Sequence, residues 1–140
     1  MSEWSQQYVD ALNSHDPEKV AAFFADDGST ESVGSGPQWV IKGRDAIMAL
    51  ISALDQFSND SKITLVNEMQ SGDQFVIEYE ETATNTGKIA RGVPATNNQY
   101  TVRGVWVGRL DADGKIMEVR DYADRLDLFT QLGLLKAPGG

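Results

Sequence analysis

The sequence of 140 residues contains no cysteine. This absence excludes disulfides, thiolate metal sites, iron–sulfur clusters and cysteine nucleophiles. The chain also has a single histidine, His15, which excludes a zinc or iron site built from several histidines. We therefore expect no metal and no cofactor, and any catalysis would depend on carboxylates, phenols, indoles and amides.

Basic residues are scarce as well: 12 lysines and arginines stand against 21 acidic residues, and the formal net charge is −9. A chain of this charge lacks the positive surface that attracts nucleic acid or an anionic membrane. No apolar run approaches the ~20 residues that a membrane-spanning helix needs. The first five residues lack the basic region and the apolar stretch of a secretion signal. We expect a cytoplasmic protein without nucleic-acid or membrane partners.

A chain of this length is typical of one domain. Helical spacing of apolar residues predicts four helices, over residues 4–12, 17–25, 47–54 and 126–132. Asp16 is expected to cap the second helix, with Pro17 at its first position. Phe24 is expected to face inward from that helix, which Asp26 ends. His15 lies in the turn between the first two helices and is interpreted as exposed.

From Ser61 onward the period of the apolar residues changes to that of a strand. Alternation and two tight turns predict a meander of four strands, over residues 61–70, 74–83, 99–110 and 115–122. Met69 is expected on the buried face of the first strand. The polar stretch 84–98 is interpreted as a long loop near the mouth of a site. Separate groups of helices and antiparallel strands indicate an α+β fold.

Two acidic residues continue apolar strand faces. Glu81 follows Phe75 and Tyr79 on one face of its strand, and Asp121 follows Met117 on one face of another. On the strand between them, one face carries Tyr100, Val102, Gly104 and Trp106. Gly104 is interpreted as leaving room for a ligand. If the three faces meet, they form a concave apolar surface with two acids inside.

A carboxylate in such surroundings is harder to ionise, so its pKa rises toward that of a general acid or base. Tyrosine and tryptophan supply neutral donors for an oxyanion. Structural roles are the alternative. Asp121 would then cap the last helix or pair with Arg125, Glu81 would lie beyond the buried part of its strand, and the aromatic residues would belong to the core.

Short motifs over nearly the whole chain resemble one family when they are taken together. They are YVDALN at 8–13, FADD at 24–27, GRDAI at 43–47, GKI at 114–116, RDYAD at 120–124 and QLG at 131–133. Their order and spacing resemble the SnoaL-like branch of the nuclear-transport-factor-like superfamily. The resemblance implies a cone-shaped α+β barrel, in which a curved mixed or antiparallel sheet wraps around the N-terminal helices and encloses an apolar pocket. The domain would cover residues 1–140, with a flexible tail at 136–140.

The resemblance also implies roles for single residues. Tyr8 stands where ketosteroid isomerases have their oxyanion-hole tyrosine, and Ser32 where they have their catalytic aspartate. Limonene-epoxide hydrolases have acids at the positions of Glu81 and Asp121. SnoaL-like cyclases use an inward aspartate for intramolecular aldol closure, and Asp121 corresponds to it. The family further implies a homodimer through the outer face of the sheet, where Val105 and Val107 stand between Arg103 and Arg109.

The favoured hypothesis is a cofactor-independent acid/base enzyme for a small hydrophobic carbonyl compound, resembling a polyketide cyclase or a related isomerase. Asp121 would abstract the proton, Glu81 would share or relay it, and Tyr8, Tyr79 or Trp106 would hydrogen-bond the oxyanion. The candidate substrate-binding residues are Tyr79, Trp106, Phe75, Tyr100, Met117, Trp39 and Ser32. One alternative is a small-ligand-binding or dimerisation module without catalysis, whose acids would be exposed or salt-bridged. The other is an epoxide hydrolase of the limonene-epoxide type.

Overall fold

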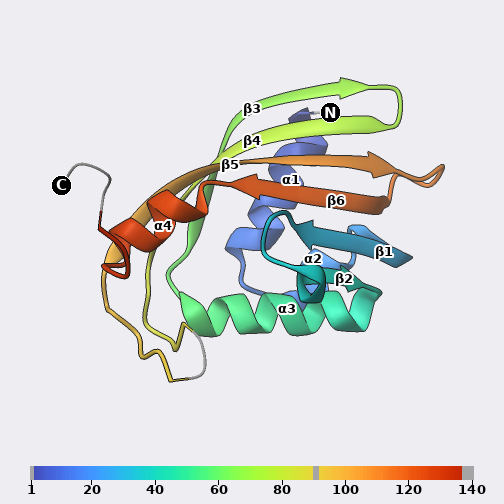
Figure 1. The fold of residues 1–140 in the computed structure, drawn as a ribbon. Coiled ribbons are helices and arrows are strands. Elements are labelled where there is room, and N and C mark those ends of the chain that lie inside the picture. Colours follow the sequence, from blue (N-terminus) through green and yellow to red (C-terminus); the bar gives the residue numbers. More distant parts are fainter. Residues whose placement is uncertain (1, 90–91, 137–140) are drawn as a thin grey trace.

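The computed structural model describes residues 2–89 and 92–136. Helices and a sheet occur in the order α1 (Ser2–Asn13), α2 (Pro17–Ala21), β1 (Phe24–Ser32), η1 (Pro37–Trp39), β2 (Val40–Lys42), α3 (Arg44–Phe57), β3 (Lys62–Ser71), β4 (Gln74–Thr84), β5 (Gln99–Leu110), β6 (Ile116–Ala123) and α4 (Arg125–Gln131). Figure 1 shows the sheet curving around α1, with α3 across one end and α4 after β6. The predicted α+β architecture is confirmed. The predicted tail lies, from residue 137 onward, outside the described residues.

The six strands form one sheet in the order β2-β1-β6-β5-β4-β3. The four strands β3 to β6 are the predicted antiparallel meander, and the turns at 71–73 and 111–114 join them as expected. Strand β1 runs parallel to β6, so the sheet is mixed. In this register Ser32, the last residue of β1, stands beside Asp121 of β6.

Strand β1 corrects the prediction of a second helix that continues past Phe24. Helix α2 ends at Ala21, and Phe24 begins the strand while remaining buried. The sequence of β1, FADDGSTES, is polar and poor in strand-forming residues, so local propensity does not indicate a strand. Pairing with β6 determines it instead. A Cβ on Gly28 would stand 2.6 Å from the carbonyl oxygen of Ile116, so only glycine allows the two strands to approach so closely.

Two bulges change which side chains of β6 and β3 face the inside of the sheet, so the faces predicted by simple alternation are wrong at Met117 and Met69. In β6, Ile116 pairs with Leu110 and Glu118 with Arg109, which leaves Met117 as an extra residue. Met117 is 38% exposed and does not lie on the inner face with Asp121. A similar shift in β3 lies between Leu65 and Asn67. As a result Met69, which simple alternation places inside, is 61% exposed.

The core has two apolar clusters. The larger packs α1 and α2 against the inner face of the sheet and contains Tyr8, Val20, Phe24, Phe75, Ile77, Tyr79 and Trp106 among its buried members. The smaller lies toward α4 and contains Ala83, Tyr100, Val102 and Leu132. Glu81 of β4 lies between Tyr79 of the first cluster and Ala83 of the second on the inner face. In the described part of the chain, no helix is long and apolar enough to cross a membrane.

The predicted loop between β4 and β5 is held by Asn85, whose side chain is fully buried. Its amide nitrogen donates to the carbonyl oxygens of Phe57 (3.2 Å) and Gly87 (2.9 Å). Its Oδ1 accepts a 2.9 Å hydrogen bond from the backbone N–H of Thr96. One side chain thus joins the end of α3 to both ends of the loop, beside the smaller cluster. Residues 90 and 91 of this loop lie outside the described residues.

Candidate active site

A tyrosine and an aspartate from different strands meet on the inner face of the sheet. The Tyr79 hydroxyl of β4 donates a 2.7 Å hydrogen bond to Oδ1 of Asp121 in β6. Strand β5 lies between them, and Gly104 is the residue that Tyr79 faces across the ladder. A Cβ on Gly104 would stand 2.5 Å from Cζ of Tyr79. The glycine therefore makes room for the phenol ring, rather than for a ligand as the sequence suggests.

Asp121 is half-buried and faces inward as predicted. Burial raises the pKa of its carboxyl above the ordinary value of 3.8, while the hydrogen bond from Tyr79 and the charge of Arg125 oppose this rise. The two structural roles that the sequence allowed for Asp121, capping the last helix and pairing with Arg125, are not observed. Asp124 caps α4 by accepting from the N–H of Asp127 at 2.9 Å, and Asp121 forms no ion pair within the described residues.

Glu81 is the second inward acid. Its Oε2 accepts a 2.6 Å hydrogen bond from the Ser61 hydroxyl. Burial is the main cause that raises the pKa of Glu81, and the negative charge of Asp121 adds to it. The Ser61 hydrogen bond and the charge of His15 act in the opposite direction. The charge of Asp121 thus acts on the carboxyl group of Glu81.

His15 does not lie in a freely exposed turn. Its Nδ1 is 2.7 Å from Oδ1 of Asp55, and its Nε2 is 2.9 Å from the carbonyl oxygen of Ser61. The residue has a positive φ of 59°, an uncommon backbone conformation for any residue but glycine. His15 thus connects α3 to the start of β3, where Ser61 contacts Glu81. The sequence carries no local signal for this role, because both partners lie about 40 residues away.

Tyr8 projects from α1 into the larger cluster. Its ring packs edge-on against Trp106 with 5.6 Å between centroids, and Trp106 stacks on Tyr79 at 4.2 Å. Burial raises the pKa of the Tyr8 hydroxyl, and the charge of Asp121 raises it further. The same two causes raise the pKa of Tyr79. Both phenols are therefore neutral hydrogen-bond donors across the physiological range.

The remaining candidates are distributed more widely. Phe75 is buried against Trp4 at 5.2 Å and belongs to the packed core. Tyr100 lies in the smaller cluster, where its hydroxyl and that of Ser58 are 2.7 Å apart and burial raises the pKa of Tyr100 to about 12. Trp39, in η1, is 40% exposed. The structure thus brings Tyr8, Tyr79, Trp106, Glu81, Asp121 and Ser32 together. Phe75 shares the apolar cluster of Tyr8, Tyr79 and Trp106, and the charge of Glu81 acts on Tyr100, whereas Met117 and Trp39 lie exposed and apart.

Arg125 was not singled out by its sequence context as a site residue. It is the first residue of α4, and its guanidinium donates to the hydroxyls of Ser32 and Ser35. Its charge lowers the pKa of both Asp121 and Tyr79, so it faces the same region. The only hint in the sequence is that Arg125 follows Asp121 by four residues.

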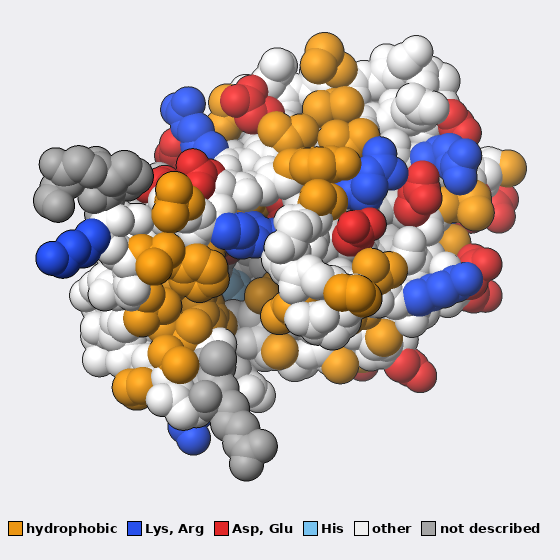
Figure 2. Space-filling model, in the orientation of Figure 1, with side chains coloured by type: hydrophobic (Ala, Val, Ile, Leu, Met, Phe, Trp, Pro, Cys, Tyr) orange, Lys and Arg blue, Asp and Glu red, His pale blue; other side chains and the backbone are white. Residues whose placement is uncertain are grey.

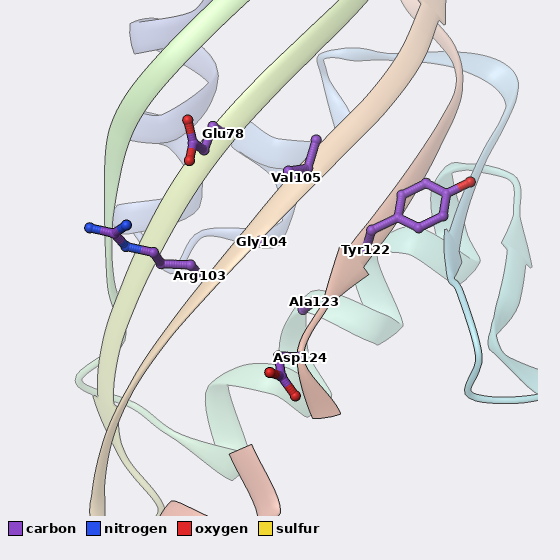
Figure 3. A pocket seen from close by; sticks show the side chains of 7 residues that line it. All are labelled: Glu78, Arg103, Gly104, Val105, Tyr122, Ala123 and Asp124. Atoms are coloured by element: carbon purple, nitrogen blue, oxygen red, sulfur yellow. The ribbon is translucent and has the colours of Figure 1, made fainter. Parts of the chain in front are cut away.

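The surface formed by the described residues is hollowed beside α4, between α2 and α3, and on the outer face of the sheet. Figure 2 shows the hollow beside α4, where the pale blue of histidine is visible in depth and a basic side chain stands at the edge. A hollow of about 460 Å³ lies between α2 and α3 beside Lys115. Another of about 300 Å³ lies on the outer face of the sheet (Figure 3) and is lined by Glu78, Arg103, Gly104, Val105, Tyr122, Ala123 and Asp124. Neither measured hollow is lined by Glu81 or Asp121.

The inner arrangement is suited to proton transfer. It joins two carboxyl groups of raised pKa, two neutral phenols and one guanidinium in largely apolar surroundings. Such groups can remove a proton, return it and stabilise an oxyanion. In the described part of the chain, no group of three or more histidine and acidic side chains is placed to hold a metal ion.

The sequence matches the SnoaL-like domain family over residues 5–119, so this chain belongs to that family. The structure is similar to that of TsrD from Streptomyces laurentii, with a TM-score of 0.82, 23% identity and coverage of 96% of this chain and 95% of that one. A candidate polyketide cyclase from Xanthomonas campestris pv. campestris gives a TM-score of 0.81, 20% identity and coverage of 94% and 95%.

SalBIII is an epoxide hydrolase/cyclase-like enzyme with a role in pyran ring formation in the polyether salinomycin. It gives a TM-score of 0.73, 19% identity and coverage of 90% of this chain and 92% of SalBIII. At these identities the solved structures establish the fold alone, and the predicted curved α+β fold is confirmed. A comparison with curated proteins returns no match.

Proposed function

We propose that this protein is a cofactor-independent acid/base enzyme that removes a proton next to the carbonyl group of a small hydrophobic substrate, as a polyketide cyclase or a related isomerase does. The observation that supports this most directly is the 2.7 Å hydrogen bond from Tyr79 to Asp121 on the inner face of the sheet. It fixes Oδ1 and leaves Oδ2 as the basic oxygen. Family membership favours the same chemistry.

In this proposal Oδ2 of Asp121 takes a proton from the carbon next to the carbonyl. The electron pair of the broken C–H bond moves to the carbonyl oxygen and forms an enolate, to which Tyr8 donates a hydrogen bond. In a cyclase, the enolate carbon then attacks a second carbonyl carbon of the same molecule, and the resulting alkoxide takes the proton back from Asp121. In an isomerase, Asp121 returns the proton to another carbon. Glu81 shares the proton in the interval.

The state of the acids argues against a module that only binds a ligand. For such a module the sequence predicts exposed or salt-bridged acids. Glu81 and Asp121 are half-buried, bonded to neutral hydroxyls, and free of ion pairs within the described residues. Their raised pKa values come mainly from burial, which is a cost that a binding module has no reason to retain.

Proton abstraction can be tested without the natural substrate. A hydrophobic ketone such as 2-tetralone exchanges its acidic hydrogens in D₂O, and NMR measures the rate. We expect the protein to accelerate this exchange and Asp121→Asn to lower the enzyme-dependent rate about 10²- to 10⁴-fold. Glu118→Gln, on the outer face of the same strand, is the matched control and should exchange normally. Equal rates for Asp121→Asn and the unmodified protein would refute the proposal.

The proposed enzyme is a homodimer that associates through the outer face of the sheet. Val105 and Val107 lie half-buried on this face. Charges around them are already paired, with Arg103 3.2 Å from Glu80 and Arg109 3.9 Å from Glu118. Figure 2 shows hydrophobic side chains grouped between acidic and basic ones. An apolar centre with a charged rim is the usual composition of a subunit interface.

A further inference from the structure

Arg125 differs from the other described arginines in lacking a carboxylate partner. Arg44 pairs with Asp26, Arg103 with Glu80, and both Arg109 and Arg120 with Glu118. In the part of the chain that the structure describes, no acidic oxygen lies within ion-pair distance of Arg125. Its guanidinium donates instead to two neutral hydroxyls, those of Ser32 and Ser35. A half-buried cation without a direct ion pair is available to an anionic group of a ligand.

The hydroxyls hold Arg125 in place next to the reacting groups. Ser32 is the register neighbour of Asp121, and its hydroxyl lies 3.0 Å from that of Ser35. The next residue is also joined to Asp121: the backbone N–H of Val33 donates a 3.0 Å hydrogen bond to the carbonyl oxygen of Asp121. The end of β1 and the start of α4 thus fix the guanidinium at one side of Asp121. Its Nη1 makes no hydrogen bond among the described residues.

The charges nearby limit what anion would fit. Glu81 and Asp121 are both acidic, and they repel a ligand with several negative charges. One guanidinium beside two serine hydroxyls matches a group with a single negative charge and two oxygens. A carboxylate meets this description, whereas a phosphate monoester carries more charge than Arg125 compensates.

We propose that Arg125, held by Ser32 and Ser35, binds a carboxylate on the substrate, so that the substrate class is a hydrophobic keto acid rather than a neutral ketone. This inference rests on the proposed function, because it assigns the orientation of the substrate relative to Asp121. The carboxylate lies against Nη1, and the apolar body extends toward Trp106 and Tyr79. Arg125 then determines substrate specificity, because it binds the substrate before the proton is removed.

The test compares two ligands of the same shape, 2-naphthoate and the neutral 2-naphthamide. Their Kd values are measured at pH 7 and low salt, by titration calorimetry, for the unmodified protein and its variants. We expect the unmodified protein to prefer naphthoate by about tenfold or more, because charge-assisted hydrogen bonds are roughly twice as strong as neutral ones. Arg125→Gln should remove this preference and change the Kd of naphthamide less than about twofold. Arg125→Lys should retain part of it.

Two controls separate the possible outcomes. Arg103→Gln removes a cation from the outer face and should keep the preference for naphthoate. Asp121→Asn should keep or increase the preference, since it removes a nearby negative charge, and near-ultraviolet circular dichroism confirms that each variant is folded. An unmodified protein that binds both ligands equally, or binds neither, would overturn the inference, as would an unchanged preference in Arg125→Gln. Because the readout is binding, it can fail or succeed independently of ketone exchange.

Discussion

The phenol ring of Tyr79 occupies the space into which a side chain on Gly104 would project. The two residues face each other across the ladder between β4 and β5. Because this position has no Cβ, the ring lies across β5 and its hydroxyl reaches Asp121 on the next strand. A glycine far from the reacting oxygens in sequence thereby controls the hydrogen bond of the proposed base.

Replacing this glycine tests the relationship directly. Gly104→Ala places a methyl group against the Tyr79 ring, and we expect it to destabilise the fold by about 1–3 kcal/mol and to displace the hydroxyl from Asp121. Gly108→Ala is the comparison on the same strand, since its Cβ would stand 2.8 Å from Cε1 of Phe75 and 2.6 Å from the carbonyl oxygen of Glu118, and would not meet Tyr79. Urea unfolding should show a loss of stability in both variants. The pH profile of kcat/KM for 2-tetralone exchange should shift only in Gly104→Ala. A profile that moves equally in both would contradict this role.

Tyr79→Phe removes the hydroxyl and keeps the ring. The hydrogen bond from Tyr79 lowers the pKa of Asp121, so its loss should raise that pKa further. The acidic limb of the kcat/KM profile should therefore shift to higher pH. On that limb kcat/KM should be lower than in the unmodified protein, because a smaller fraction of Asp121 is ionised at a given pH. Tyr122→Phe, which changes an exposed tyrosine on the outer face, serves as the control. An unshifted profile in Tyr79→Phe would show that the hydroxyl does not act on Asp121.

The buried acids should also make stability depend on pH. The folded protein holds the Glu81 proton at higher pH than the unfolded chain does, because burial raises the pKa above its ordinary value of 4.5. The contribution of this proton to the free energy of unfolding is fully present below pH 4.5, and it is lost as the pH rises through the raised pKa of Glu81. Glu81→Gln should therefore be more stable than the unmodified protein at pH 7, by about 1 kcal/mol.

Urea unfolding from pH 4 to pH 8, at one protein concentration, measures this difference. The advantage of Glu81→Gln should shrink as the pH is lowered, and Asp121→Asn should follow the same course for the same reason. Glu78→Gln, on the outer face of β4, removes the same charge without touching the inner face. A constant difference between Glu81→Gln and the unmodified protein at all pH values would refute the assignment of burial as the cause.

The proposed dimer is tested by its mass in solution. The chain has a mass of 15.3 kDa, and light scattering at micromolar concentration should give twice this value. Val107→Asp places a charge at the centre of the proposed interface and should yield the monomer. Val66→Asp introduces the same charge at the bulge of β3, where the native side chain is already exposed, and should remain dimeric. A monomeric unmodified protein would exclude the dimer.

The sequence was sufficient to predict the central meander and the two inward acids. Alternation has a period of two residues and needs no knowledge of distant partners, so Glu81 and Asp121 could be assigned to the inner face. The tight turns at 71–73 and 111–114 are equally local. Motif order was enough to suggest the family that the comparison then established.

Only the tertiary structure decided the rest, because it depends on contacts between distant segments. Strand β1 exists through pairing with β6, and that pairing brings Ser32 and Arg125 to Asp121. A bulge, which alternation cannot anticipate, moves Met117 outward. The room beside Gly104 belongs to Tyr79, since strand register, not composition, determines which side chain fills it. The sequence therefore determined which acids turn inward, and the packing of the sheet determined what surrounds them.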